Sequence, residues 1–132
     1  MDFKYSEDEK YFADMFCEGD VNKLRTKFKE SFDFRSVTIK RREFNGKRKT
    51  LFPIISERAN GTCQICKSAE GNELDHIIPL GSNYLNKKFR KMKPLRVGGK
   101  LKKVPSESYG SNNIRNLQLA CKPCNRKKWY RF

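Results

Sequence analysis

The chain has 132 residues and a formal net charge of +15, from 30 Lys and Arg against 15 Asp and Glu. This length fits one domain with room for a small extension. The longest apolar run covers only residues 51–55, too short for a membrane span, and the acidic, polar first ten residues do not resemble a secretory signal. We therefore expect a soluble cytoplasmic protein with no membrane partner. The excess of positive charge predicts a polyanionic partner, most simply a nucleic acid.

The positive charge is concentrated in three segments. Residues 35–50 carry a net charge of +6, residues 81–105 carry +9, and residues 121–132 carry +5. One such run alone is as readily a solvated face as a binding surface. Three runs around one candidate site favour a surface that binds phosphates, with an affinity that falls as salt rises.

Two helices are predicted at the start of the chain. Residues 6–18 have apolar side chains at helical spacing, and Ser6 with Glu9 forms the sequence of a capping box. Gly19 would end this helix, and Asp20 would cap a second one. The pair predicts a helical hairpin whose apolar stripes belong to the core.

A basic β-hairpin is predicted next. Residues 37–44 partly alternate between apolar and polar side chains, and Asn45-Gly46 follows as a strong hairpin-turn signal. Residues 52–59 are expected to form a short helix. Residues 81–105, which include Gly98-Gly99, are expected to form a long basic loop or a loose hairpin.

Four of the five cysteines form two Cys-x-x-Cys pairs, Cys63 with Cys66 and Cys121 with Cys124. Two-residue spacing lets both sulfurs of a pair reach one tetrahedral ion, and four thiolates close its coordination shell. A structural zinc site is therefore the favoured interpretation, over four unrelated buried thiols or a redox pair. Cys17 is left over and is expected to be a plain buried thiol.

The only histidine, His76, follows Asp75 in a short apolar strand between the two cysteine pairs. Side chains alternate along a strand, so a bend or twist is needed if both residues are to serve one site. A second strand is predicted around Asn116. Pro123 then suits the first turn of a helix that carries Asn125 and Lys128.

These motifs resemble those of the HNH endonucleases over about residues 58–129. The matching strings are Cys63-x-x-Cys66, Asp75-His76-Ile77-Ile78-Pro79, Asn116-Leu117-Gln118-Leu119 and Cys121-x-x-Cys124-Asn125-x-x-Lys128. The resemblance implies an α+β protein with a ββα-metal core. We expect residues 51–132 to form the nuclease domain, with 81–105 as a basic insertion. Residues 1–50 would be an extension for DNA binding or dimerisation.

The resemblance also implies a role for each matching residue. Asp75 would ligate the catalytic metal, and His76 would be the general base. Asn116 would hold the two strands together and fix the orientation of the histidine. Asn125 stands where many members have the final histidine, a metal ligand, so this chain has an H-N-N form that the family also contains. Lys128 would contact phosphate.

Two metals with separate roles are expected. Asp75 and Asn125 offer oxygen ligands and the chain has no second histidine, which favours Mg²⁺ or Mn²⁺ over Zn²⁺ at the catalytic position. Zinc would occupy the sulfur site. Further contacts with nucleic acid are expected from the basic segments: Arg41, Arg42, Lys87, Lys88, Arg90, Lys91, Lys102 and Lys103.

The resemblance implies metal-dependent hydrolysis of phosphodiester bonds with 5′-phosphate and 3′-hydroxyl products, and we expect the substrate to be double-stranded DNA. A restriction enzyme, acting as a homodimer, and a phage or mobile-element nuclease are both compatible with the sequence. An RNA-directed nuclease stays open as well. The alternative from another class is a non-catalytic, zinc-dependent module that binds nucleic acid.

Overall fold

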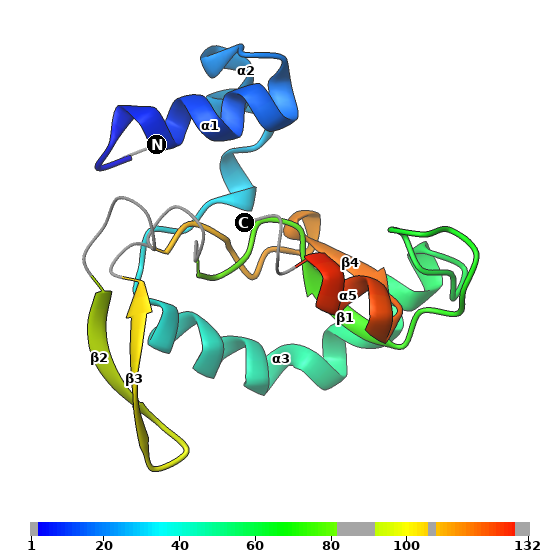
Figure 1. Cartoon of the computed structure of the whole chain (residues 1–132). Helices are drawn as coiled ribbons and strands as arrows, with labels where there is room; N and C mark the ends of the chain where they lie inside the picture. Colours follow the sequence, from blue (N-terminus) through cyan, green and yellow to red (C-terminus); the bar gives the residue numbers. More distant parts are fainter. Residues whose placement is uncertain (1–2, 82–91, 106–107, 129–132) are drawn as a thin grey trace.

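The computed structural model describes residues 3–81, 92–105 and 108–128 (Figure 1). None of the helices in these ranges combines the length and the apolarity that a bilayer span requires. The elements in chain order are α1 (Ser6–Cys17), α2 (Val21–Lys27), a 3-10 turn (Lys29–Ser31), α3 (Val37–Arg58), β1 (Glu73–His76), β2 (Met92–Val97), β3 (Lys100–Pro105), a second 3-10 turn (Ile114–Asn116), β4 (Leu117–Ala120) and α5 (Lys122–Lys128).

The helical hairpin predicted at the start of the chain is present as α1 and α2. Asp20 caps α2 as expected, since its side chain accepts a hydrogen bond from the backbone N–H of Lys23. The capping box predicted for α1 is wrong. Tyr5 occupies the N-cap position, where its side chain makes no capping hydrogen bond, and Glu9 instead forms an ion pair with Arg25 of α2 at 2.8 Å.

The two N-terminal helices pack against the loops that precede and follow the β2–β3 segment. Phe12 and Leu24, which are fully buried, lie in one cluster with Phe32, Ile78 and Tyr109. The Tyr109 hydroxyl also donates to the buried carboxylate of Asp8. Because this second contact is a hydrogen bond, it favours one orientation of α1 against the loop that carries Tyr109.

The basic β-hairpin predicted over residues 37–46 is wrong, because these residues belong to α3. Ser36 caps this helix by accepting from the backbone N–H of Ile39, and α3 continues through the short helix expected at 52–59. Phe44 and Ile55 lie on the side that packs against Leu117 of β4. Burial of this stripe against the sheet outweighs the local turn preference of Asn45-Gly46.

The helix α3 also crosses the domain boundary that the sequence suggested between residues 50 and 51. Its first half reaches the loop around Gly110, and its second half covers the β1–β4 pair (Figure 1). The helix α3 therefore contacts both the loop before β4 and the β1–β4 strand pair.

Two antiparallel strand pairs complete the fold. In the first pair, β1 lies beside β4 with Asp75 opposite Gln118 and His76 opposite Leu117, and α5 follows β4 directly. This is the ββα arrangement and the α+β class that the sequence predicted. In the second pair, β2 and β3 are joined at Gly98 and Gly99, whose φ angles are +60° and +79°. Two residues with positive φ form the turn that suits a tight hairpin.

A buried lysine connects α3 to the loop before β4. The side chain of Lys40 is fully buried, and its Nζ donates to the backbone carbonyl of Gly110 at 2.7 Å and to that of Asp33. Burial lowers the pKa of Lys40 to about 8, because the charged amine loses hydration. Residue 110 must be glycine, since a Cβ atom there would lie 2.0 Å from the carbonyl oxygen of Ile78.

The interior position of Gly46 in α3 gives a test of the helix against the hairpin. Gly46→Ala is expected to raise the free energy of unfolding by about 0.5–1 kcal/mol, because alanine is the better helix former. The added Cβ meets no atom within 4 Å. Chemical denaturation of the two proteins measures the difference. A loss of stability would contradict the helix, because a turn with positive φ at this glycine would be strained by alanine.

Candidate functional site

The four cysteines of the two Cys-x-x-Cys pairs come together in the structure. Their Sγ atoms lie within 4.8 Å of one another. A zinc ion bonded at about 2.3 Å to four sulfurs requires them to be about 3.8 Å apart, so the cluster fits a tetrahedral site. Among the described residues, no other group of three or more His, Cys, Asp or Glu side chains is placed to hold a metal. The fifth cysteine, Cys17, is buried in the core of the N-terminal helices, as expected.

Hydrogen-bond donors lower the pKa values of the first cysteine pair. Hydrogen bonds from the Ser68 hydroxyl and from nearby backbone N–H groups lower the pKa of Cys66 to about 5. Burial by itself would raise the pKa of Cys63, but backbone N–H groups outweigh it and the pKa is lowered. The neighbouring thiol of Cys121 and burial raise the pKa of Cys124 to about 12. A bound cation would favour the thiolate form of Cys124, since metal ligation requires the deprotonated sulfur.

A set of oxygen and amide groups lies where β1, β4 and α5 meet. Gln118 donates through Nε2 to Oδ2 of Asp75 at 2.8 Å, across the strand pair. Asn125 of α5 donates through Nδ2 to Oε1 of Glu73 at 3.1 Å. Glu73 and Asp75 are two residues apart in β1, so both carboxylates lie on the same face of the strand. Asp75 is buried, with 6% of its surface exposed.

His76 lies on the other face of β1, as strand alternation predicts, and contacts α3. The ring of Phe44 meets the imidazole edge to face, with centroids 4.5 Å apart. The Nε2 atom of His76 lies 2.9 Å from Oδ1 of Asn112, in the loop before β4. The imidazole is therefore held from a helix on one side and from a loop on the other.

The buried side chain of Asn116 joins the segments that flank the two strands. Its Oδ1 accepts from the backbone N–H of Ile78 at 2.8 Å. Its Nδ2 donates to the carbonyl oxygens of Ile78, at 3.0 Å, and of Ser111, at 2.8 Å. These bonds connect the end of β1 to the start of β4. Asn112, rather than Asn116, forms the hydrogen bond with Nε2 of the imidazole.

The basic residues expected to contact nucleic acid lie in several places. Arg41 and Arg42 are exposed on α3. Lys102 and Lys103 belong to β3, and Lys128 ends α5. The others, Lys87, Lys88, Arg90 and Lys91, lie outside the described residues.

Several residues beside the expected site were missed from the sequence. Glu73 carried a usable signal, because it precedes Asp75 by two positions in the same strand. Gln118 becomes visible only once the register of β1 and β4 is known. Phe44 and Asn112 reach His76 through tertiary contacts, for which the sequence holds no local pattern.

Removal of one cysteine ligand is expected to cost the protein its metal and its C-terminal fold. Cys121→Ser should bind less than one zinc per chain and lose the cooperative thermal transition, because structural zinc supplies about 10–16 kcal/mol in small zinc folds. Metal analysis and circular dichroism measure both. Cys17→Ala serves as the control and should retain one zinc. A folded, zinc-free Cys121→Ser protein would contradict the structural role of the site.

The comparisons with known proteins agree with this geometry. The family model described as HNH endonuclease matches residues 103–131, which include β4, α5 and the second cysteine pair. No curated protein and no solved structure matches the chain. The matched segment, the paired strands β1 and β4 and the four clustered cysteines together are similar to the ββα-metal core of the HNH endonucleases, in the form that carries four cysteines.

Proposed function

We propose that the protein is a metal-dependent DNA endonuclease, which hydrolyses phosphodiester bonds to leave 5′-phosphate and 3′-hydroxyl ends. The observation that supports the proposal is that Asp75 and His76 end strand β1, which pairs with β4, and that Asn125 lies on the helix α5 directly after β4. Nucleic-acid binding alone requires none of these three residues. A restriction enzyme or a phage or mobile-element nuclease is the setting that we propose for it, with a homodimer as the form that acts on double-stranded DNA.

The donor atoms beside α5 suit a hard divalent cation. Asp75 and Glu73 provide carboxylates, and Asn125 provides an amide whose Nδ2 is engaged by Glu73, so that its Oδ1 is the ligand atom. Mg²⁺ and Mn²⁺ prefer such oxygen ligands. When bound at Asp75 and Asn125, either ion supplies positive charge that stabilises the phosphate as negative charge develops on it.

The chain's own residues divide the remaining tasks. His76 accepts a proton from the attacking water, since imidazole exchanges protons near neutral pH. Asn116 keeps β1 and β4 in register at the point where His76 leaves the strand. Lys128, the last residue of α5, contacts a phosphate of the bound strand.

The DNA-binding surface in this proposal includes α3. Six Lys and Arg of this helix are exposed: Arg41, Arg42, Lys47, Arg48, Lys49 and Arg58. The helix α1 and its end have the opposite character, because residues 6–20 contain six Asp and Glu and one Lys. DNA therefore approaches from the side of α3, and residues 1–50 contribute to binding through this helix. Lys102 and Lys103, which belong to β3, are further DNA contacts in this proposal.

Cleavage of supercoiled plasmid tests the catalytic assignment. His76→Ala is expected to lower the cleavage rate with Mg²⁺ at least about 100-fold, because the proton acceptor is lost. DNA binding, measured by gel shift, and zinc content should stay unchanged. Omission of Mg²⁺ from the wild type should also abolish cleavage. A His76→Ala protein that cuts at the wild-type rate would contradict the role of the histidine.

The same assay separates the nuclease from a plain binding module. Absence of cleavage by the wild type, together with tight binding that weakens with salt in both proteins, would favour the non-catalytic alternative.

Salt dependence of DNA binding tests the surface on α3. The double variant Arg41→Gln/Arg42→Gln should bind DNA more weakly at all sequences. The slope of log K against log salt should fall by about 0.9 for each phosphate that the variant no longer neutralises. Lys10→Gln, an exposed lysine among the acidic residues of α1, is the matched control and should leave the slope unchanged. An unchanged slope in the double variant would remove α3 from the binding surface.

A further inference from the structure

The hydrogen bond between His76 and Asn112 has a direction that its surroundings determine. Asn112 donates through Nδ2 to the backbone carbonyl of Lys40 at 2.8 Å, and a carbonyl can only accept. The other end of the amide, Oδ1, therefore faces Nε2 of His76 at 2.9 Å. An amide oxygen also only accepts, so Nε2 carries the hydrogen. In the neutral ring, the lone pair that takes up a proton then lies on Nδ1.

We propose that Asn112 is the positioning residue of His76. Oriented by the carbonyl of Lys40, it holds the imidazole in the form with hydrogen on Nε2 and makes Nδ1 the proton-accepting atom. This inference deepens the proposed nuclease function and rests on it. It also moves the task of orienting the histidine from Asn116, which bonds to Ile78 and Ser111, to Asn112.

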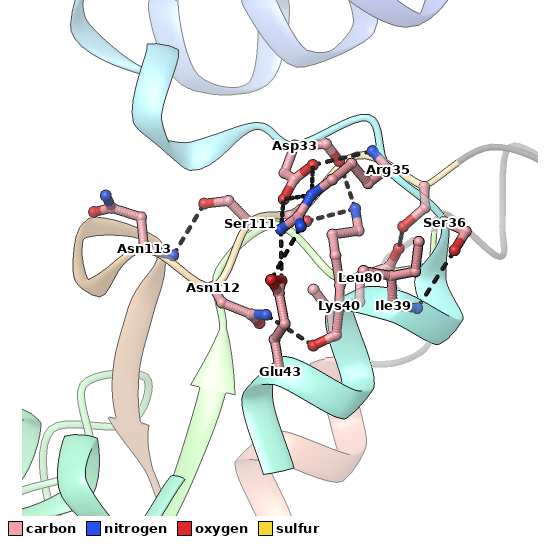
Figure 2. Close-up of polar contacts among 12 residues, drawn as sticks. Asp33, Arg35, Ser36, Ile39, Lys40, Glu43, Leu80, Ser111, Asn112 and Asn113 are labelled. Carbon is pink, nitrogen blue, oxygen red and sulfur yellow. Dashed lines mark hydrogen bonds and ion pairs between the residues drawn. The ribbon is translucent and has the colours of Figure 1, made fainter. Parts of the chain in front are cut away.

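The carbonyl that orients Asn112 is itself held in place. Lys40 is fully buried, and its Nζ donates to the carbonyl oxygens of Asp33 and Gly110, the latter only two residues before Asn112. Figure 2 shows the side chain of Asn112 reaching the backbone of α3 at Lys40. Lys40 thus contacts this loop twice. Its side chain donates to the carbonyl of Gly110, and its own carbonyl accepts from the side chain of Asn112.

A cluster of charges next to Lys40 strengthens this end of α3. Arg35 bridges Asp33 and Glu43, and its distance to the Asp33 carboxylate is 2.8 Å (Figure 2). Burial would raise the pKa of Asp33, but the hydrogen bonds from Arg35 outweigh it and the pKa is lowered. Asp33 therefore stays ionised beside the Lys40 amine at neutral pH.

The second contact of the imidazole comes from the same helix. Phe44 follows Lys40 by four residues, about one helical turn, and its ring lies 4.5 Å from the imidazole centroid. The ring of His76 is thus limited in translation by Phe44 and in rotation by Asn112. Phe44 belongs to α3, and Asn112 is oriented by the carbonyl of Lys40 in the same helix, which lies outside the segment that matches the HNH family model.

Nuclear magnetic resonance can observe this hydrogen bond directly, because His76 is the only histidine in the chain. The zinc-loaded full chain, labelled with ¹⁵N in the imidazole and free of added Mg²⁺, gives one pair of ring signals. The wild type is expected to carry its hydrogen on Nε2 at high pH and to exchange it slowly with water. Asn112→Ala should accelerate this exchange about fivefold or more, because the acceptor is lost.

Two further variants make the comparison specific. Asn113→Ala is the matched control, since Asn113 is exposed and its side chain accepts from the backbone N–H of Arg115. It should leave exchange and cleavage unchanged. Asn112→Asp keeps an oxygen opposite Nε2 but loses the donor to the Lys40 carbonyl, so it should exchange faster than the wild type and more slowly than Asn112→Ala.

Cleavage kinetics provide the second readout. Asn112→Ala is expected to lower kcat about 10- to 100-fold with little change in KM, because orientation of the base changes while DNA contacts remain. Zinc content and the thermal transition should match the wild type. Hydrogen on Nδ1 in the wild type, or exchange and kcat that Asn112→Ala does not alter, would overturn the proposal. If the wild type does not cleave DNA, the proposed nuclease function is wrong. The exchange rates then decide by themselves whether Asn112 holds the imidazole ring.

Discussion

The side chain of Asn116 is the constraint on which the core of this protein depends. It is fully buried, and its amide forms three hydrogen bonds, two to the backbone of Ile78 and one to that of Ser111. A buried amide costs free energy unless its groups are paired, so its position is specified once these partners are in place. The register between β1 and β4 can therefore be kept although many residues separate the two strands in the sequence. The segment 108–113 that results provides the partners of both Lys40 and His76.

The helix α3 connects this core to the rest of the chain. Ile55 packs on the β1–β4 pair, Phe44 contacts the imidazole, and Lys40 is buried under the loop at Gly110. The burial of an amine is costly, and the lowered pKa of Lys40 reflects that cost. Its two carbonyl partners and the nearby carboxylate of Asp33 offset it. A lysine in this position specifies one docking geometry, which an apolar side chain would leave less defined.

The sequence predicted those features that depend on short-range patterns or on the number of ligands that a metal ion binds. The two Cys-x-x-Cys pairs predicted that the four cysteines meet, because thiolates at this spacing can bind one ion. Asp20 predicted the start of α2, because its capping hydrogen bond reaches only three residues along the chain. The prediction failed at Asn45-Gly46, where the turn preference is local but the burial of α3 is not. Asn112 was missed for a similar reason. Its partners are 36 and 72 residues away in the chain, and only the folded structure brings them together.

The sulfur site and the oxygen site are coupled through the first turn of α5. The backbone N–H of Asn125 donates to the carbonyl oxygen of Cys121 at 3.0 Å, so the helix begins directly at the third cysteine. A helix of seven residues has little stability of its own. Its orientation must come from Cys121 and Cys124, which tie it to the cluster with Cys63 and Cys66. An ion held by these sulfurs would fix the start of α5 and, with it, the position at which Asn125 donates to Glu73.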